Sequence, residues 1–144
     1  MVLTRKSAGL ALLFLGLAAR QASAVTSCLD LITAVDAIFD TGTIELEGGF
    51  TCDIFITVTA GQDVTISGAY TITIGAGFAG STGADGSLFV NEGGLKLDGI
   101  TFATETTDGN RAVWNVGTLS VEGCTFELYP TGAFLSRGGV IFEA

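Results

Sequence analysis

Two stretches of the chain, LFVNEGGLKLDGITF at Leu88–Phe102 and AVWNVGTLSVEGCTF at Ala112–Phe126, align without a gap at an offset of 24 residues. Apolar positions coincide, one Asn and two Gly recur in the same places, and both copies end in Thr-Phe. Internal similarity at a period of about 20 to 50 residues is typical of solenoids, whose units bury their apolar faces only against their neighbours. The repeat therefore predicts a stack of similar coils.

Each copy contains three short apolar runs and no helical period. Runs that alternate apolar and polar residues predict β-strands with one buried and one solvated face; they are Ile44–Leu46, Ile54–Val58, Val64–Ile66, Ile72–Ile74, Leu95–Leu97 and Leu119–Val121. Glycines between the runs permit the bends. Since three strands per turn close a coil of about two dozen residues, we expect an all-β solenoid, a parallel β-helix of about 24-residue turns.

Equivalent residues of such coils lie above one another. Asn91 over Asn115 predicts an amide ladder at a corner of the coil, and Phe102 over Phe126 predicts an aromatic stack in its interior. We expect both pairs to serve the fold rather than a ligand.

Two further positions of the repeat concern reactive or aromatic side chains. Cys124 occupies the place of Ile100, so an inert core thiol is the preferred interpretation and a reactive or bridging thiol the alternative. Trp114 occupies the place of Val90, which predicts a core residue before a platform for a sugar ring.

The N-terminus has the three parts of a secretory signal. Arg5-Lys6 forms a basic start, an apolar run extends over residues 8–19, and the small residues Ala22 and Ala24 predict cleavage before Val25. The run is about a dozen residues, shorter than the roughly 20 that a membrane-spanning helix needs. We expect a signal peptide over residues 1–24, a secreted, extracellular or cell-surface product, and no transmembrane helix after cleavage.

The segment after the signal has a different period from the rest. Apolar residues recur every three or four positions from Leu29 to Phe39, behind the hydroxyl residues Thr26 and Ser27, which predicts an amphipathic helix with a hydroxyl N-cap. The period changes to two after Gly42. We expect a capping helix within residues 25–42 and the β-helix over residues 43–144.

The charge of the chain excludes some partners. Cleavage leaves three basic residues, Lys96, Arg111 and Arg137, against all 15 acidic ones, a net charge of −12. Nucleic acids and anionic lipids are bound through Lys and Arg contacts to phosphates. We therefore expect no binding to nucleic acid or to a membrane surface.

Three cysteines remain in the exported chain, where thiols can pair. Cys28 with Cys52 is the preferred disulfide, and one cysteine must be left over. Spacing alone does not decide the pairing.

The chain resembles right-handed parallel β-helix proteins of the pectin-lyase-like superfamily, and among them the repeats of polymorphic outer membrane proteins. The resemblance rests on Gly93–Phe102, on its copy ending in Gly123–Phe126, and on Gly138–Ile141, which is similar to the Gly-Gly-Ala-Ile motif of those repeats. The short helix followed by Gly42–Leu46 resembles their N-terminal cap. The resemblance implies a right-handed coil. It implies no single activity, because this scaffold carries lyases, hydrolases, epimerases, adhesins and surface proteins.

Catalysis is the weaker expectation. Enzymes of the superfamily act on acidic polysaccharides and need a base and clustered cations or Ca²⁺, whereas this sequence has no His and its basic residues are scattered. We expect a non-catalytic structural, adhesion or binding module with an extracellular polysaccharide or surface partner. The alternative is a fragment of a polysaccharide-active enzyme: a lyase, hydrolase or epimerase.

No cofactor is required by the sequence. Asp98 and Glu122 align one rung apart and are the candidate ligands for a Ca²⁺ ion, with Asp85 and Asp108 as weaker ones.

Threonine triplets at 57–59 and 71–73 suggest an ice-binding surface, but Lys96, Asp98, Ser120 and Glu122 interrupt the row in later turns, so ordinary strand propensity is the preferred explanation. The sequence ends just after the next turn begins, which predicts a truncated C-terminus, or self-association through an open end.

Overall fold

The computed structural model describes residues 24–78, 86–106, 110–127, 134–136 and 139–143. These described residues form one short helix and thirteen strands that run parallel in three sheets. Sheet I has the order β1 (Thr41–Glu45), β4 (Asp63–Ser67), β7 (Gly94–Asp98), β10 (Thr118–Glu122) and β13 (Gly139–Glu143). Sheet II comprises β2 (Phe50–Cys52), β5 (Thr71–Ile74), β8 (Thr101–Thr104) and β11 (Thr125–Phe126). Sheet III comprises β3 (Ile56–Val58), β6 (Ser87–Asn91), β9 (Arg111–Asn115) and β12 (Phe134–Ser136).

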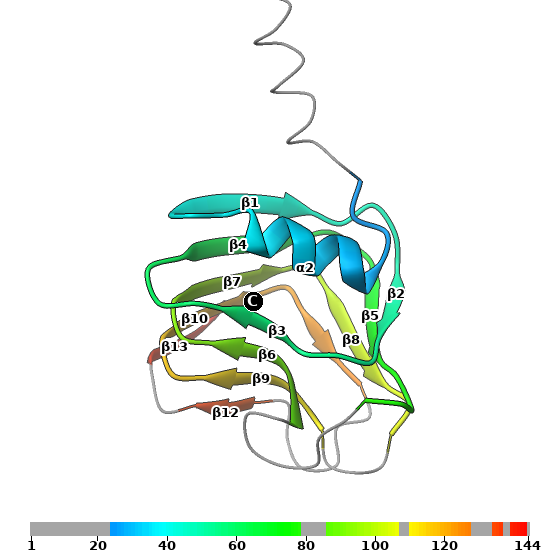
Figure 1. The fold of residues 1–144 in the computed structure, drawn as a ribbon. Coiled ribbons are helices and arrows are strands. Elements are labelled where there is room, and N and C mark those ends of the chain that lie inside the picture. Colours follow the sequence, from blue (N-terminus) through cyan, green and yellow to red (C-terminus); the bar gives the residue numbers. More distant parts are fainter. Residues whose placement is uncertain (1–23, 79–85, 107–109, 128–133, 137–138, 144) are drawn as a thin grey trace, which may run out of the picture.

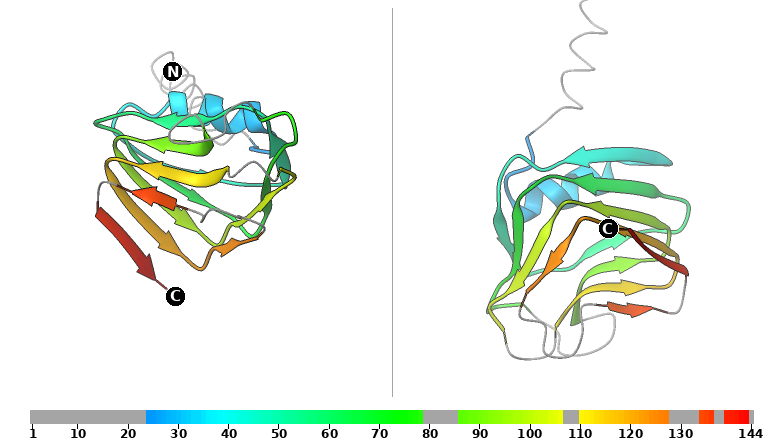
Figure 2. Two further views of the ribbon diagram at one scale, coloured as in Figure 1. Left: turned by 90° about the horizontal axis from the view of Figure 1, so that it is seen from below. Right: turned by 180° about the vertical axis from the view of Figure 1, so that it is seen from behind.

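The chain visits the three sheets in the same order on each circuit, which is consistent with a β-solenoid (Figure 1). The views from below and from behind show the strands of each sheet stacked one above another (Figure 2). Every strand pair is parallel and in register, so that each strand hydrogen-bonds to its equivalent in the coils on either side.

The step between coils varies. Gly94 pairs with Thr118, which is the 24-residue offset of the sequence repeat. The other steps in sheet I join Thr41 to Asp63, Asp63 to Gly94, and Thr118 to Gly139. The step from Asp63 to Gly94 is the longest because more residues, 75–86, connect β5 to β6 than connect any other two successive strands. A single period of 24 residues therefore does not describe the whole stack.

The core is built from the inward row of each strand. Phe102 is fully buried and lies parallel to Phe126, with ring centroids 5.2 Å apart and 4° between the planes. Phe89 meets Phe102 edge to face at 6.3 Å. Stacked and edge-to-face aromatic contacts are worth about 0.5 to 1.5 kcal/mol beyond the area they bury.

A column of glycines makes the corner between sheets I and II. Gly68, Gly99 and Gly123 have φ values of 141°, 72° and 59°, a region that residues with a side chain adopt at a cost. The Gly68 amide donates to Asp98 O at 3.2 Å, and the Gly99 amide donates to Glu122 O at 2.9 Å. The same sharp bend is therefore repeated in three successive coils.

Helix α2 (Cys28–Asp36) lies over the first coil, against β1, β2 and β3 (Figure 1). Ser27 is the N-cap and its Oγ accepts from the Asp30 amide at 3.1 Å. Hydrogen bonds from the Ser27 side chain and the Thr26 amide lower the pKa of the Asp30 carboxyl. Leu31 and Val35, on the side of the helix that faces the coil, are fully buried. The helix therefore covers the apolar end of the stack, as its amphipathic pattern predicts.

Two bonds fix the helix to the coil. Cys28 and Cys52 form a disulfide with Cα atoms 5.3 Å apart, the pair preferred from the sequence. Gln62 Nε2, in the first corner loop, donates to Val35 O at 3.0 Å and to Ile38 O at 2.5 Å. Gln62 Oε1 accepts from the Thr59 amide at 2.8 Å. One buried amide thus joins the C-terminal end of α2 to the corner between β3 and β4.

Three sequence predictions need correction or fall outside the described residues. The strand predicted over Ile54–Val58 begins at Ile56, because Ile54 and Phe55 lie at an exposed corner. Trp114 is half-buried and alternates with buried Val113, so it lies on the outer side of sheet III and is not a core residue. The predicted signal peptide lies outside the described residues except for Ala24.

We predict that Gln62→Ala lowers the free energy of unfolding by about 1 to 3 kcal/mol, because it leaves buried carbonyls at the end of α2 without their donor. Urea denaturation measures this loss. Glu47→Ala, which removes an exposed side chain between β1 and β2, is the control and should change stability little. Equal losses in the two variants would show that the Gln62 bonds carry no stability.

We predict that the double change Cys28→Ser with Cys52→Ser costs about 3 to 4 kcal/mol, since the bridge closes a segment of 24 residues. Peptide mapping of the non-reduced protein should recover Cys28 linked to Cys52, with Cys124 as a free thiol. A peptide joining Cys124 to either of the others would contradict this pairing.

Candidate functional site

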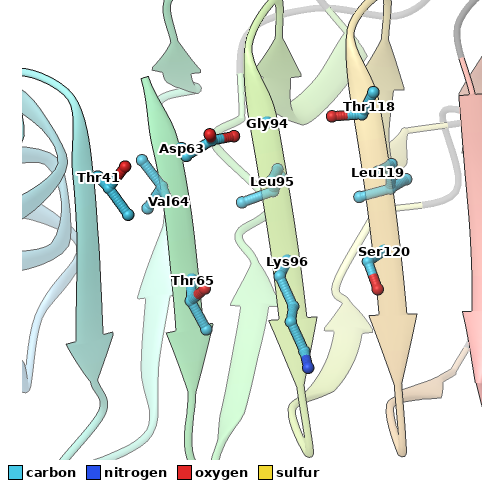
Figure 3. Close-up of a pocket in the computed structure, with 10 residues that line it drawn as sticks. All are labelled: Thr41, Asp63, Val64, Thr65, Gly94, Leu95, Lys96, Thr118, Leu119 and Ser120. Carbon is cyan, nitrogen blue, oxygen red and sulfur yellow. The ribbon is translucent and has the colours of Figure 1, made fainter. Parts of the chain in front are cut away.

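A shallow groove crosses the first four strands of sheet I, with a volume of about 360 Å³. Ten residues line it: Thr41, Asp63, Val64, Thr65, Gly94, Leu95, Lys96, Thr118, Leu119 and Ser120. They come from corresponding positions of β1, β4, β7 and β10, three residues from each of the last three strands (Figure 3). The groove is therefore a product of the stacking register.

The alternation of each strand decides which side chains face the groove. Val64, Leu95 and Leu119 are buried in the core, so the residues on either side of them point outward. One outward line holds Thr41, Asp63, Gly94 and Thr118, and the next holds Thr65, Lys96 and Ser120. The outward side chains of the groove are therefore four hydroxyl groups, one carboxylate and one ammonium group.

Gly94 makes a notch in the first of these lines. A Cβ atom at this position would collide with Asp63 Oδ1 and would come within 3.5 Å of Thr118 Oγ1. The carboxylate of Asp63 therefore lies over the backbone of β7, in space that any other residue would occupy (Figure 3). Asp63 is exposed and has no hydrogen bond or ion pair from its side chain within the described part of the chain.

Lys96 is the cation of the groove. Its Nζ lies 2.9 Å from Glu122 Oε2, and both side chains are more than a third exposed. An ion pair at this exposure contributes about 0 to 1 kcal/mol. Its main effect is local, because it neutralises Lys96 and leaves Asp63 as the uncompensated charge of the groove.

The proposed calcium ligands lie at the far ends of the same strands. Asp98 and Glu122 are paired in register, but Glu122 already contacts Lys96. Among residues 24–78, 86–106, 110–127 and the two short C-terminal strands, no three His, Cys, Asp or Glu side chains gather as a metal site would require. Asp85 and Asp108 lie outside the described residues.

The aligned Asn pair forms a ladder inside a corner. Asn91 and Asn115 are fully buried, and Asn91 Nδ2 donates to Asn115 Oδ1 at 2.6 Å and to Thr118 O at 2.8 Å. Asn115 Nδ2 donates to Gly117 O at 3.2 Å. Together with the Phe102 and Phe126 rings, these side chains support the coil and are not among the residues that line the groove of sheet I.

Sequence reasoning missed a line of hydroxyls on sheet II. It treated Lys96, Asp98, Ser120 and Glu122 as continuing the threonine row of residues 71–73, but these four lie on sheet I. The residue that follows Thr71 in sheet II is Thr101, which pairs with Thr125. The correct row could have been found by aligning the coils at the bends.

Comparison with protein-family models, curated proteins and solved structures finds no match to this chain. The described residues also include no helix with the length and apolar character needed to cross a bilayer.

Cys124 packs against the core but is only half-buried, unlike Ile100 in the coil below, which is fully buried. Its Sγ lies 3.5 Å from Glu122 O, in position to donate to it. Burial raises the pKa of the Cys124 thiol, and the charge of Asp98 acts in the same direction.

We predict that iodoacetamide alkylates Cys124 more slowly in the folded protein than in the urea-unfolded chain at the same pH. The thiolate is the nucleophile, and a raised pKa reduces its fraction at neutral pH, so the rate should climb as the pH is raised toward that pKa. Mass spectrometry follows the uptake, and Cys124→Ser should take up no label. A folded rate equal to or above the unfolded rate would indicate an activated thiol.

Proposed function

We propose that this protein is a secreted or cell-surface module, built as a right-handed parallel β-helix of the pectin-lyase-like kind, that binds an extracellular polysaccharide through the groove of sheet I without cleaving it. The observation that carries the proposal is the repeated line of polar side chains across β1, β4, β7 and β10. Neighbouring strands are about 4.8 Å apart, so a linear polymer lying across them meets at least one polar side chain from each strand in turn.

The chemistry of the lining suits a sugar chain. Thr65, Thr118 and Ser120 supply hydroxyls that donate and accept, and Asp63 supplies an acceptor that bonds two adjacent sugar hydroxyls. The lack of a side chain at Gly94 lets this carboxylate lie over β7, within the outward line of the groove. Few groups in the groove are committed to other partners, which leaves them available to a ligand.

The charge of the groove argues for the class of polysaccharide. Lys96 pairs with Glu122, and within the described residues Asp63 has no ion pair of its own. Glu45 and Asp98 add negative charge at the ends of their strands. A polyuronate would be repelled by this field. A neutral or amino-bearing polysaccharide is the class that the groove favours.

The lining of the groove argues against glycoside hydrolysis. Asp63 is the one carboxylate among the ten residues that line it, whereas most glycosidases use a pair of Asp or Glu residues that flank the scissile bond. Asp98 and Glu122 lie in register on neighbouring strands, but outside the groove, and Glu122 is paired with Lys96. The sequence also has no His to act as a base. Export is supported by the Cys28–Cys52 disulfide, since such bonds persist in oxidising compartments.

Affinity electrophoresis of the purified protein in gels containing neutral β-glucan, chitosan or polygalacturonate tests the proposal. We expect retardation by the neutral or amino-bearing polymer and none by polygalacturonate. Thr65→Tyr, which places a ring across the groove, should abolish the retardation. Thr57→Tyr, an equal change at a half-buried outward position of sheet III, is the matched control and should bind like the original chain.

Two outcomes would overturn the proposal. Binding that survives Thr65→Tyr would place the ligand elsewhere, and release of reducing or unsaturated ends from any of the polymers, with or without Ca²⁺, would show an enzyme of the polysaccharide-active class.

A further inference from the structure

The outer side of sheet II carries five threonines, Thr51, Thr71, Thr73, Thr101 and Thr125, which we call the threonine face. All five point away from the core, because each alternates with inward residues such as Cys52, Ile72 and Phe102. Thr51, Thr71 and Thr125 are exposed, and Thr73 and Thr101 are half-buried.

The strand register arranges these side chains in two lines. Thr71 pairs with Thr101 and Thr101 with Thr125, which gives one line of three. Thr51 pairs with Thr73, and Thr73 with Ala103, which gives a second line beside it. Adjacent strands are about 4.8 Å apart, and alternate residues of one strand are about 6.6 Å apart. The hydroxyls therefore occupy a nearly rectangular lattice.

The lattice is stiff and its hydroxyls are unengaged. Threonine has few χ1 rotamers because it is β-branched, and each strand of the face is hydrogen-bonded to its neighbours. None of the five hydroxyls has an intramolecular partner among the described residues. A ligand would meet donors and acceptors that are already ordered, so little conformational entropy is lost on binding.

The threonine face is also uncharged, in a chain with 15 acidic residues. Within the described strands of sheet II, no outward residue carries a charge. Asp53, Glu105 and Glu127 follow directly after β2, β8 and β11, so acidic side chains border the face along one side. This border disfavours an anionic occupant, and the uncharged strand positions favour a neutral one. The occupant must also be flat, periodic on the scale of the lattice, and able to exchange hydrogen bonds with hydroxyls while the threonine methyl groups fill the gaps between them.

A surface of ice meets all these requirements, since its oxygen atoms repeat at spacings close to those of the lattice and each can donate or accept. We propose that the threonine face binds ice. This activity is independent of the groove on sheet I, which lies on a different side of the coil and carries charge.

The test measures how much of the protein is incorporated into a slowly growing ice hemisphere, together with thermal hysteresis. We expect the original chain to enter the ice in excess of serum albumin and to arrest crystal growth over a measurable temperature gap. Thr101→Lys places a charge at the centre of the face and should reduce both signals to the albumin level. Thr65→Lys, the same change at a half-buried outward position of sheet I, should leave both unchanged.

A gain-of-function variant separates an effect on ice binding from an effect on folding. Ala103→Thr extends the second line by one hydroxyl and should raise thermal hysteresis, while circular dichroism confirms the fold of each variant. If Thr101→Lys does not fold, Thr71→Lys at an exposed position of the face replaces it.

Three results would overturn the proposal: exclusion of the original chain from ice, equal effects of Thr101→Lys and Thr65→Lys, or no ice signal together with binding to crystalline cellulose or chitin that Thr101→Lys removes. The last result would assign the face to a neutral crystalline polymer. Thr65→Tyr distinguishes this failure from that of the groove, since it acts on sheet I alone.

Discussion

In-register parallel stacking is the constraint on which the rest of the structure depends. Each residue must pack directly on its equivalent in the next coil. Backbone hydrogen bonds set the distance between the two strands at about 4.8 Å. The Asn91–Asn115 amide bond, the parallel rings of Phe102 and Phe126, and the column of corner glycines are three solutions to this requirement. The same constraint orders the outer surface, because side chains that point outward are aligned as strictly as those of the core.

The two outer faces differ in chemistry although their geometry is alike. On sheet I the lines mix hydroxyls with Asp63 and the Lys96–Glu122 pair, which creates an uneven, acidic groove with a notch at Gly94. On sheet II the outward strand positions hold threonine and alanine. One scaffold thus presents a surface suited to a hydrated, hydroxyl-rich chain and another suited to a regular neutral plane. The chemical difference between the two faces rests on a handful of side chains.

The repeat, the strands of sheet I, the capping helix and the disulfide could be predicted from the sequence, because each depends on a local period or on a pair of residue types. The assignment of residues to sheets could not. The longer connection between β5 and β6 shifts the spacing after Ile74, so a fixed period places Thr71 and Lys96 in one row although they lie on different sheets. Trp114 was assigned to the core for a related reason: its partner Val90 is apolar, yet both alternate with the buried row.

The register between β7 and β10 has a genetic consequence. Because a coil touches only the coils on either side, a second copy of residues 94–117 inserted after Gly117 would present the same upper and lower surfaces to its neighbours. Tandem duplication of that coding segment would lengthen the protein by one whole coil without a new packing solution. The similarity of the two aligned stretches is what such an event leaves behind, and duplication of this kind would enlarge both outer faces one coil at a time.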